Sequence, residues 1–352
     1  MKKYNSFYPG NEWLDTAGKP IQAHGFHIFF DKNLNEYCWV GANHEFSHAG
    51  GTVWANGVKL YTSTDLYNWT DRGIIIPPSD DLSNPLHSTY KMDRPHILYC
   101  EKTGKYIAWV HIIDNGQFVV ILQADNILGP YTMVKPSYYP LNMGIGDFSF
   151  HYDETAKKQY IFFNRAHYEL VCAELTDDYT AVTENYSVHL SGKIPPFTRE
   201  APVFTEHNGK KYLFTSGTTG YHPNQTIVHT MDDYHGEYKE LCDPFVNDKN
   251  KISFNSQISC ILKPNGKDCY IACADRWITD DDVAKQAKRV HDYFIANSDE
   301  FAFDDSPKYP YPMPGKLQIN DADTYKSRYV WLPITFEFDI PKICWKDEWK
   351  YK

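Results

Sequence analysis

The sequence has no long apolar run and no stripe of basic residues. No stretch approaches the roughly 20 apolar residues of a membrane-spanning helix, and residues 1–10 lack the apolar core of a secretory signal. Acidic residues outnumber basic ones by 45 to 35, and the net charge of −10 would repel a polyanion. We therefore expect a cytoplasmic protein that binds neither membranes nor nucleic acids. The sequence does not indicate an oligomeric state.

The eight cysteines are too scattered for a disulfide framework. Cys269 and Cys273 lie four positions apart, but no second Cys/His pair nearby completes a zinc site. Alternation with apolar residues, as around Cys273, is typical of small buried residues in a reduced protein. We expect free thiols, no metal site and no required cofactor.

Amphipathic helical patterns are almost absent before residue 280. Short apolar and aromatic runs recur instead, with turn residues between them, which indicates an all-β protein. The predicted strands are 26–30, 37–41, 58–64, 95–100, 105–112, 117–123, 147–152, 159–164, 168–175, 200–206, 210–216, 225–231, 255–263, 268–274 and 329–338.

These strands group into repeated units, several of which open with an acid before an apolar strand, as at Asp93, Asp147 and Glu200. Repetition at this period predicts propeller blades, whose innermost strands line a central channel. We expect residues 1–352 to form a single five-bladed β-propeller, with the polar residue at the start of each inner strand directed to one end of the channel. The predicted blades are 21–85, 90–140, 144–190, 198–245 and 253–340.

The repeat is interrupted at 278–327, which we interpret as an insertion in the last blade. Residues 280–290 read as a capped helix, and 309–314 as an extended loop rich in proline. Such an insertion lies on the surface, or folds over the channel mouth or a neighbouring subunit.

Aromatic residues are plentiful, with 27 Tyr and 9 Trp. They favour strands and a surface that stacks against sugar rings, although most of them are expected in the core. Hydrolysis of a glycosidic bond usually needs a carboxylic acid that protonates the leaving oxygen. Glu200 precedes an apolar run, so burial would raise its pKa toward that of a working acid, unless it forms a structural ion pair with Arg199. Asp93 and Asp147 are further candidates, the latter also typical of a turn.

The order and spacing of several segments resemble glycoside hydrolase family 43, and within it the subgroup of exo-β-1,3-galactanases and related furanosidases. The segments are 21–28, 58–69, 93–95, 105–111, 199–202, 215–224, 255–257, 274–277 and 327–333. The resemblance implies a five-bladed propeller and inversion at the anomeric carbon. It places Glu200 on the general acid and Asp93 on the residue that tunes and orients it, where close members tend to have glutamate.

Most of the family has an aspartate base at the start of the first inner strand, but this sequence has His24, as the galactanase-like subgroup does. In that subgroup a glutamine corresponding to Gln257 is thought to position or activate water. An amide is a poor base, so Gln257 either relays a proton as a rare tautomer or only orients the water. His24 could assist, or be structural.

Other side chains are predicted to bind sugar hydroxyls or stack on the ring. Besides His24 they are Arg94, Asp147, Asn164, Thr219, Tyr221, Asn224 and Trp277. Glu45, Asp275 and Arg276 could be ligands or ion-pair members, and Trp331 is expected in the core. The resemblance also allows a structural calcium ion in the channel, although no EF-hand loop is present.

These features predict an exo-acting, inverting hydrolase that releases terminal galactose-type units, with a neutral oligosaccharide such as a β-1,3-galactan as substrate. An α-L-arabinofuranosidase or β-galactofuranosidase would share the same catalytic residues. Because the aspartate base is missing, a non-catalytic sugar-binding propeller is the alternative from another class.

Overall fold

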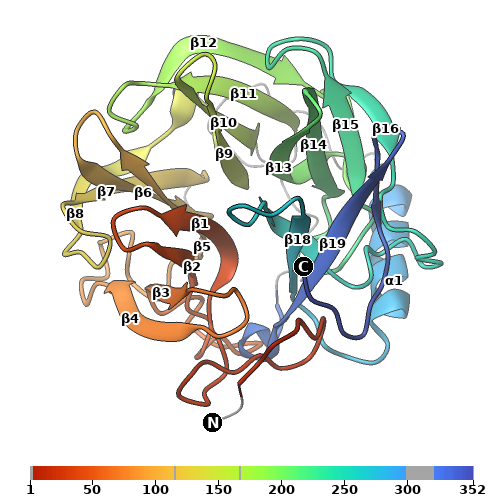
Figure 1. Ribbon diagram of the computed structural model, residues 1–352, viewed down its shortest axis with the longest axis horizontal. Helices are drawn as coiled ribbons and strands as arrows, with labels where there is room; N and C mark the ends of the chain where they lie inside the picture. Colours follow the sequence, from red (N-terminus) through yellow and green to blue (C-terminus); the bar gives the residue numbers. More distant parts are fainter. Residues whose placement is uncertain (1–2, 115, 166–167, 299–320, 352) are drawn as a thin grey trace.

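In the computed structural model, the described residues are 3–114, 116–165, 168–298 and 321–351. Within them the chain forms five antiparallel sheets of four strands each, arranged around a central axis (Figure 1). The innermost strands are β1, β5, β9, β13 and β17, and each sheet continues outward in sequence order. This arrangement is a five-bladed β-propeller, which confirms the predicted fold class.

Each blade is built from consecutive strands. The first three blades are β1 (His24–Asp31), β2 (Glu36–Ala42), β3 (Val58–Ser63) and β4 (Thr70–Ile76); β5 (Met92–Cys100), β6 (Lys105–Ile112), β7 (Phe118–Ala124) and β8 (Thr132–Tyr138); and β9 (Phe148–Asp153), β10 (Lys158–Arg165), β11 (Glu169–Leu175) and β12 (Val182–His189). The last two are β13 (Arg199–His207), β14 (Lys210–Gly217), β15 (Ile227–Met231) and β16 (Lys239–Cys242); and β17 (Gln257–Leu262), β18 (Tyr270–Arg276), β19 (Arg328–Glu337) and β20 (Ile340–Ile343).

Apolar side chains from neighbouring blades pack between the sheets. In β10, Ile161 and Phe163 pack against the second blade, whereas Tyr160 and Phe162 pack against the fourth. Successive side chains of a strand point to opposite faces, so a strand between two blades is buried on both faces and reads as a continuous apolar run. This double burial explains why the period of two is weak in these strands.

The two ends of the chain help to close the ring. The Phe7 N–H donates a 2.7 Å hydrogen bond to Trp349 O, and Trp349 N–H donates back to Phe7 O at 3.1 Å. Both side chains join an aromatic cluster between the first and last blades that also contains Trp331, as expected. The closure therefore combines backbone pairing of the terminal segments with burial of large rings.

Each of the fifteen predicted strands corresponds to an observed one, but the prediction missed β4, β8, β12, β16 and β20. These are the outermost strands of the five blades. They mix polar and apolar residues, as in β8 with its exposed Thr132, Val134 and Ser137, because only one side of the blade edge packs on the core.

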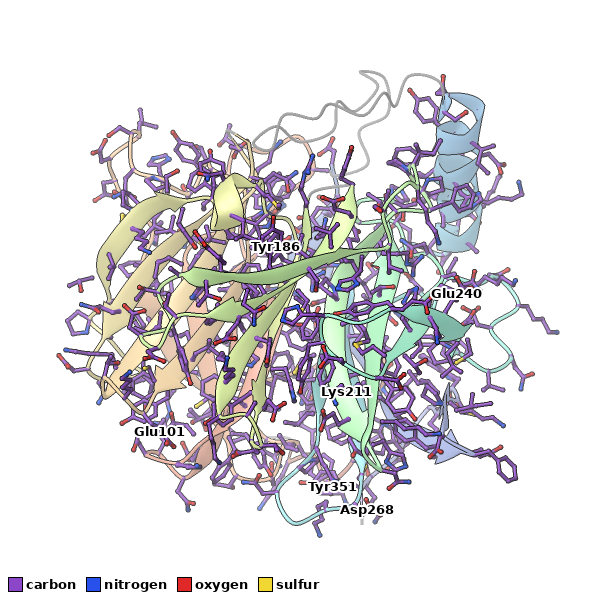
Figure 2. The ribbon with its side chains drawn as sticks, turned by 90° about the horizontal axis from the view of Figure 1, so that it is seen from above. Glu101, Tyr186, Lys211, Glu240, Asp268 and Tyr351 are labelled. Atoms are coloured by element: carbon purple, nitrogen blue, oxygen red, sulfur yellow. The ribbon has the colours of Figure 1, made fainter. Side chains whose placement is uncertain are left out.

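The predicted insertion lies between β18 and β19 and contains helix α1 (Val283–Ala296), which begins and ends later than predicted. The short 3₁₀ helices η1 (Pro140–Asn142) and η3 (Thr324–Lys326) complete the described helices. The predicted loop 309–314 lies outside the described residues. Figure 2 shows α1 toward one face of the propeller and Glu101 and Asp268, which follow β5 and β17, toward the other.

All eight cysteines are free, and five of them are buried. Within the described ranges, no helix is long and apolar enough to cross a membrane.

Candidate active site

A cavity of about 660 Å³ lies at the starts of the inner strands. Eight of the predicted site residues line it together: Asp93, Arg94, Asp147, Asn164, Glu200, Tyr221, Gln257 and Trp277. The prediction missed six lining residues: Trp54, His111, Ile113, Gln117, Gly146 and Gly220. The propeller therefore gathers polar groups from blades two to five into one site, as the repeat predicted.

A backbone irregularity at the start of β5 and of β13 directs the two predicted acids. Arg94 follows Asp93 with φ of 45°, and Ala201 follows Glu200 with φ of 46°. The strand register shifts at both places, as at a β-bulge, and a proline follows each positive-φ residue. Bulges re-aim side chains at the rims of sheets, and here they bring both carboxyl groups to the cavity wall.

The guanidinium of Arg94 connects several of the cavity groups. Its Nη2 donates to Gln257 Oε1 at 2.6 Å and to Asp147 Oδ2 at 3.1 Å. Its Nη1 donates to Ser259 Oγ at 3.0 Å, and Ser259 in turn donates to the buried Asp275 at 2.7 Å. Charge-assisted hydrogen bonds of this kind hold a site rigid, so Arg94 fixes side chains of β17 and of the residue just before β9.

The amide of Gln257 has a defined orientation. Its Oε1 accepts hydrogen bonds from Arg94 and from Trp277 Nε1, the latter at 3.1 Å, and both partners can only donate. The Nε2 group must therefore face the other way, where it donates to Ser216 Oγ at 2.8 Å and to Glu200 Oε1 at 3.3 Å. Gln257 thus contacts the predicted general acid directly.

Glu200 has the environment of a proton donor. Burial, and next the charge of Asp147, raise its pKa well above the usual value, while Arg94 and the Gln257 hydrogen bond act against this shift. The tuning and orienting role that the resemblance implies for Asp93 stays a prediction, and Asp147 is the carboxylate whose charge adds to burial in raising the Glu200 pKa. Arg199, the alternative ion-pair partner, donates to Thr215 Oγ1 at 2.9 Å and to Thr215 O at 2.6 Å.

Asp93 also has a raised pKa. Burial raises its pKa to about 7, with Arg94 lowering and Asp147 raising the value. Its Oδ1 accepts the Arg94 N–H at 2.8 Å, and a Cβ atom on Gly25, at φ +56°, would lie 2.3 Å from that oxygen. Glycine at position 25 is therefore needed for the close approach of β1 to the Asp93 carboxyl group.

His24 does not line this cavity. Its side chain is fully buried, with Nδ1 3.0 Å from Asp275 Oδ1 and Nε2 3.3 Å from the Tyr329 hydroxyl. The Gly25 N–H also donates to Asp275, at 3.1 Å. This placement assigns His24 and Asp275 to the support beneath the site rather than to its surface.

Two other predicted sugar ligands, Thr219 and Asn224, brace their own loop. Asn224 donates to Gly217 O and to Thr219 Oγ1, each at 2.7 Å, and accepts the Gly217 N–H at 2.6 Å. Arg276 similarly holds loop carbonyl groups, those of Phe254 and Asn255. Glu45 is exposed and outside the cavity lining.

The side chains on the cavity wall whose buried polar atoms lack a hydrogen-bond partner in the described structure include Asn164 at Oδ1, Tyr221 at its hydroxyl group and Trp54 at Nε1. An unmet buried donor or acceptor costs roughly 1–3 kcal/mol, so these atoms favour a ligand with many hydroxyl groups. Trp54 gave no signal in the sequence beyond being an aromatic residue in a loop.

Among the residues the structure describes, no group of three or more His, Cys, Asp or Glu side chains is arranged so that it could hold a metal ion. The calcium ion allowed in the channel stays a prediction.

Comparisons with known proteins also indicate a glycoside hydrolase. The model of the glycosyl hydrolases family 43 matches residues 36–288. No curated protein sequence matches the chain. A solved family 43 β-1,3-galactosidase is 25% identical, with a TM-score of 0.77 over 99% of this chain and 64% of that one. A second, with galactodeoxynojirimycin, is 27% identical, with a TM-score of 0.75 over 98% of this chain and 100% of that one.

The exo-β-1,3-galactanase of Phanerochaete chrysosporium, solved with β-1,3-galactotriose, shares the fold at 23% identity and a TM-score of 0.76, over 99% of this chain and 69% of that one. The family model covers well over half of the chain, and the propeller places acids and an amide around one cavity. This protein therefore belongs to glycoside hydrolase family 43.

Proposed function

We propose that this protein is an exo-acting, inverting hydrolase that removes terminal galactose units from β-1,3-linked galacto-oligosaccharides. The observation that carries the proposal is Glu200, a buried carboxyl group with a raised pKa on the wall of a cavity rich in hydrogen-bonding groups. The two β-1,3-galactosidases that resemble almost the whole chain support the choice of sugar and linkage.

In this mechanism Glu200 donates its proton to the glycosidic oxygen as the bond to the anomeric carbon breaks. Water attacks that carbon from the opposite face and loses a proton, which inverts the configuration. Glu200 then regains a proton before the next turnover. Its raised pKa keeps the donor form populated at a pH where an ordinary glutamate is ionised.

Gln257 is the residue we assign to hold the attacking water. In inverting enzymes the two carboxyl groups lie about 6.5–9.5 Å apart, which leaves room for the water. The Gln257 amide donates to Glu200 at 3.3 Å here, so a bound sugar has to displace this hydrogen bond before the amide can hold water on the other face of the ring. An amide does not take up the water's proton near neutral pH. We assign that step to Asp93, because its pKa of about 7 leaves it partly ionised in this range.

Product analysis of a β-1,3-galactotetraose digest tests the proposal. We expect galactose as the first small product, initially as the α-anomer by proton NMR, with no early release of galactobiose. First-formed β-galactose would contradict inversion, and early galactobiose would contradict exo action. Cleavage of nitrophenyl arabinofuranoside or galactofuranoside, without cleavage of β-1,3-galactosides, would contradict the proposed substrate.

A further inference from the structure

Three aromatic rings form a row along one wall of the cavity. Trp277 is next to the catalytic groups, since its Nε1 donates to Gln257. The Tyr221 ring centroid lies 4.9 Å from that of Trp277, and Trp54 stacks on Tyr221 at 5.7 Å. Trp277 and Tyr221 are buried, whereas Trp54 is partly exposed. The row thus runs from the catalytic amide toward the mouth of the cavity.

The outer part of this row combines apolar ring faces with two unused polar groups. The Tyr221 hydroxyl and Trp54 Nε1 are buried and have no hydrogen-bond partner in the described part of the chain. Sugars present both C–H groups, which pack on aromatic rings, and hydroxyl groups, which would satisfy these two atoms. This chemistry fits a neutral sugar ring.

The insertion in the last blade supports the row from behind. Val283 and Ala287 on the buried face of α1 belong to the same apolar cluster as Tyr221 and Trp277, and Trp54 packs against that cluster. Figure 2 shows α1 at one face of the propeller, opposite Asp268, and the cluster places the row at that same face. The insertion is thereby part of the cavity wall rather than a detached surface feature.

The end of the insertion also holds the loop that carries Trp54. Thr324 Oγ1 donates to Ser47 Oγ at 2.8 Å, and the Ala49 N–H donates to Asp323 Oδ1 at 3.0 Å. The Tyr325 N–H donates to Ser47 O at 3.1 Å. Both described ends of the insertion therefore position aromatic side chains of the cavity.

We propose that the insertion builds a second sugar subsite, in which Trp54 and Tyr221 bind the galactosyl unit next to the terminal one. This inference rests on the proposed exo-galactosidase function: the terminal unit occupies the part of the cavity beside Glu200, and the remainder of the substrate extends toward Trp54. Trp54 and Tyr221 contact the leaving-group sugar, and Val283 and Ala287 act as positioning residues.

Binding measurements separate the two subsites. In a Glu200→Gln background, calorimetry with galactose and with β-1,3-galactobiose should show that Trp54→Ala weakens disaccharide binding by about tenfold and leaves galactose binding unchanged. Phe46→Ala is the matched control, because Phe46 is 50% exposed in the same loop and lies outside the cavity lining. Equal weakening of both sugars, or no weakening of either, would overturn the subsite.

Kinetics of the active enzyme test the role of the helix. Ala287→Asp introduces a charge on the buried face of α1, and we expect it to raise KM for galactobiose several-fold with a smaller effect on kcat. Lys285→Asp places the same residue on the exposed face and should change neither. An unchanged KM in a folded Ala287→Asp variant would remove the helix from the proposal. If Ala287→Asp does not fold, Trp54→Ala still tests the subsite.

Failure of the unmodified protein to bind or cleave any β-1,3-galactoside would instead refute the proposed function, and this inference with it.

Discussion

Strands β5 and β13 begin with the same backbone and differ in what surrounds it. Each has an acid, then a residue at positive φ, then a proline. At β5 the positive-φ residue is Arg94, whose guanidinium lies against Asp147 and Gln257. At β13 it is Ala201, whose N–H donates to Asp147 Oδ2 at 3.1 Å.

This difference shows how one local structure serves two chemical purposes. The bulge turns each carboxyl group toward the cavity, where burial is the largest cause of its raised pKa and the charges of Arg94 and Asp147 act next. At Asp93 burial raises the pKa to about 7, and the next-largest effect is the charge of Arg94, which lowers it. Glu200 lies near Asp147, whose charge adds to the effect of burial and keeps the proton on Glu200.

The largest expected effect is at Glu200. Glu200→Gln keeps the size of the side chain but removes the transferable proton, so we expect kcat on β-1,3-galacto-oligosaccharides to fall by about a thousandfold or more. The melting temperature should change little, because a neutral amide replaces a neutral carboxyl group. Galactose release and thermal melting measure the two effects. Turnover close to wild type would exclude Glu200 as the acid.

Replacement of Asp93 should have a smaller and pH-dependent effect. Asp93→Asn is expected to lower kcat by about 10- to 100-fold, because the water loses its proton acceptor. In the wild-type enzyme kcat/KM should rise with pH through about 7 as Asp93 ionises, and this limb should be lost in the variant. If the limb persists in Asp93→Asn, another group accepts the proton.

The fold was largely predictable from sequence because inner strands are buried on both faces. Strands such as β10 read as apolar runs that repeat with the blades. The outer strands were missed because contact on one side leaves them short or polar, as in the four-residue β16 with its exposed Lys239 and Glu240. Because the sequence repeat is visible only in the buried strands, it identifies the blades but not their outermost strands.

The site was predictable where it follows the repeat. Asp93, Asp147, Glu200 and Gln257 each stand at or just before an inner strand, and they share one cavity. His24 also stands at the start of an inner strand, but its side chain is turned toward Asp275 below the cavity. The direction of this side chain depends on packing, which the sequence repeat does not encode.

Trp54 was missed for another reason. Its loop joins β2 to β3 and is held by residues 323–325, far along the chain. Sequence neighbours therefore carry no information about where this ring lies.

The two acids also differ from ordinary surface carboxylates in how they affect stability. Because the folded-state pKa of Asp93 is raised to about 7, its contribution is fully present below the unfolded pKa and is lost as pH rises through the folded pKa. Unfolding free energy should therefore fall between about pH 4 and pH 7, by at most about 1.4 kcal/mol per pH unit for this group. Denaturant unfolding across this range should show a shallower fall in Asp93→Asn. An equal fall in both proteins would mean that Asp93 is not protonated in the folded state.

The smallest expected effect concerns the shared backbone itself. Ala201 adopts φ of 46°, which costs a residue with a Cβ about 1–2 kcal/mol, whereas glycine adopts it freely, as Gly25 does at φ of 56°. Glycine also loses about 0.5–1 kcal/mol through chain entropy. We expect Ala201→Gly to leave the unfolding free energy unchanged or to raise it by up to about 1.5 kcal/mol. The same substitution at Ala108, a buried residue within β6, lacks this compensation and should lower it by about 1 kcal/mol. An equal loss of unfolding free energy at both positions would show that the backbone at the start of β13 is not strained. The shared positive-φ backbone of β5 and β13 would then cost the protein no stability.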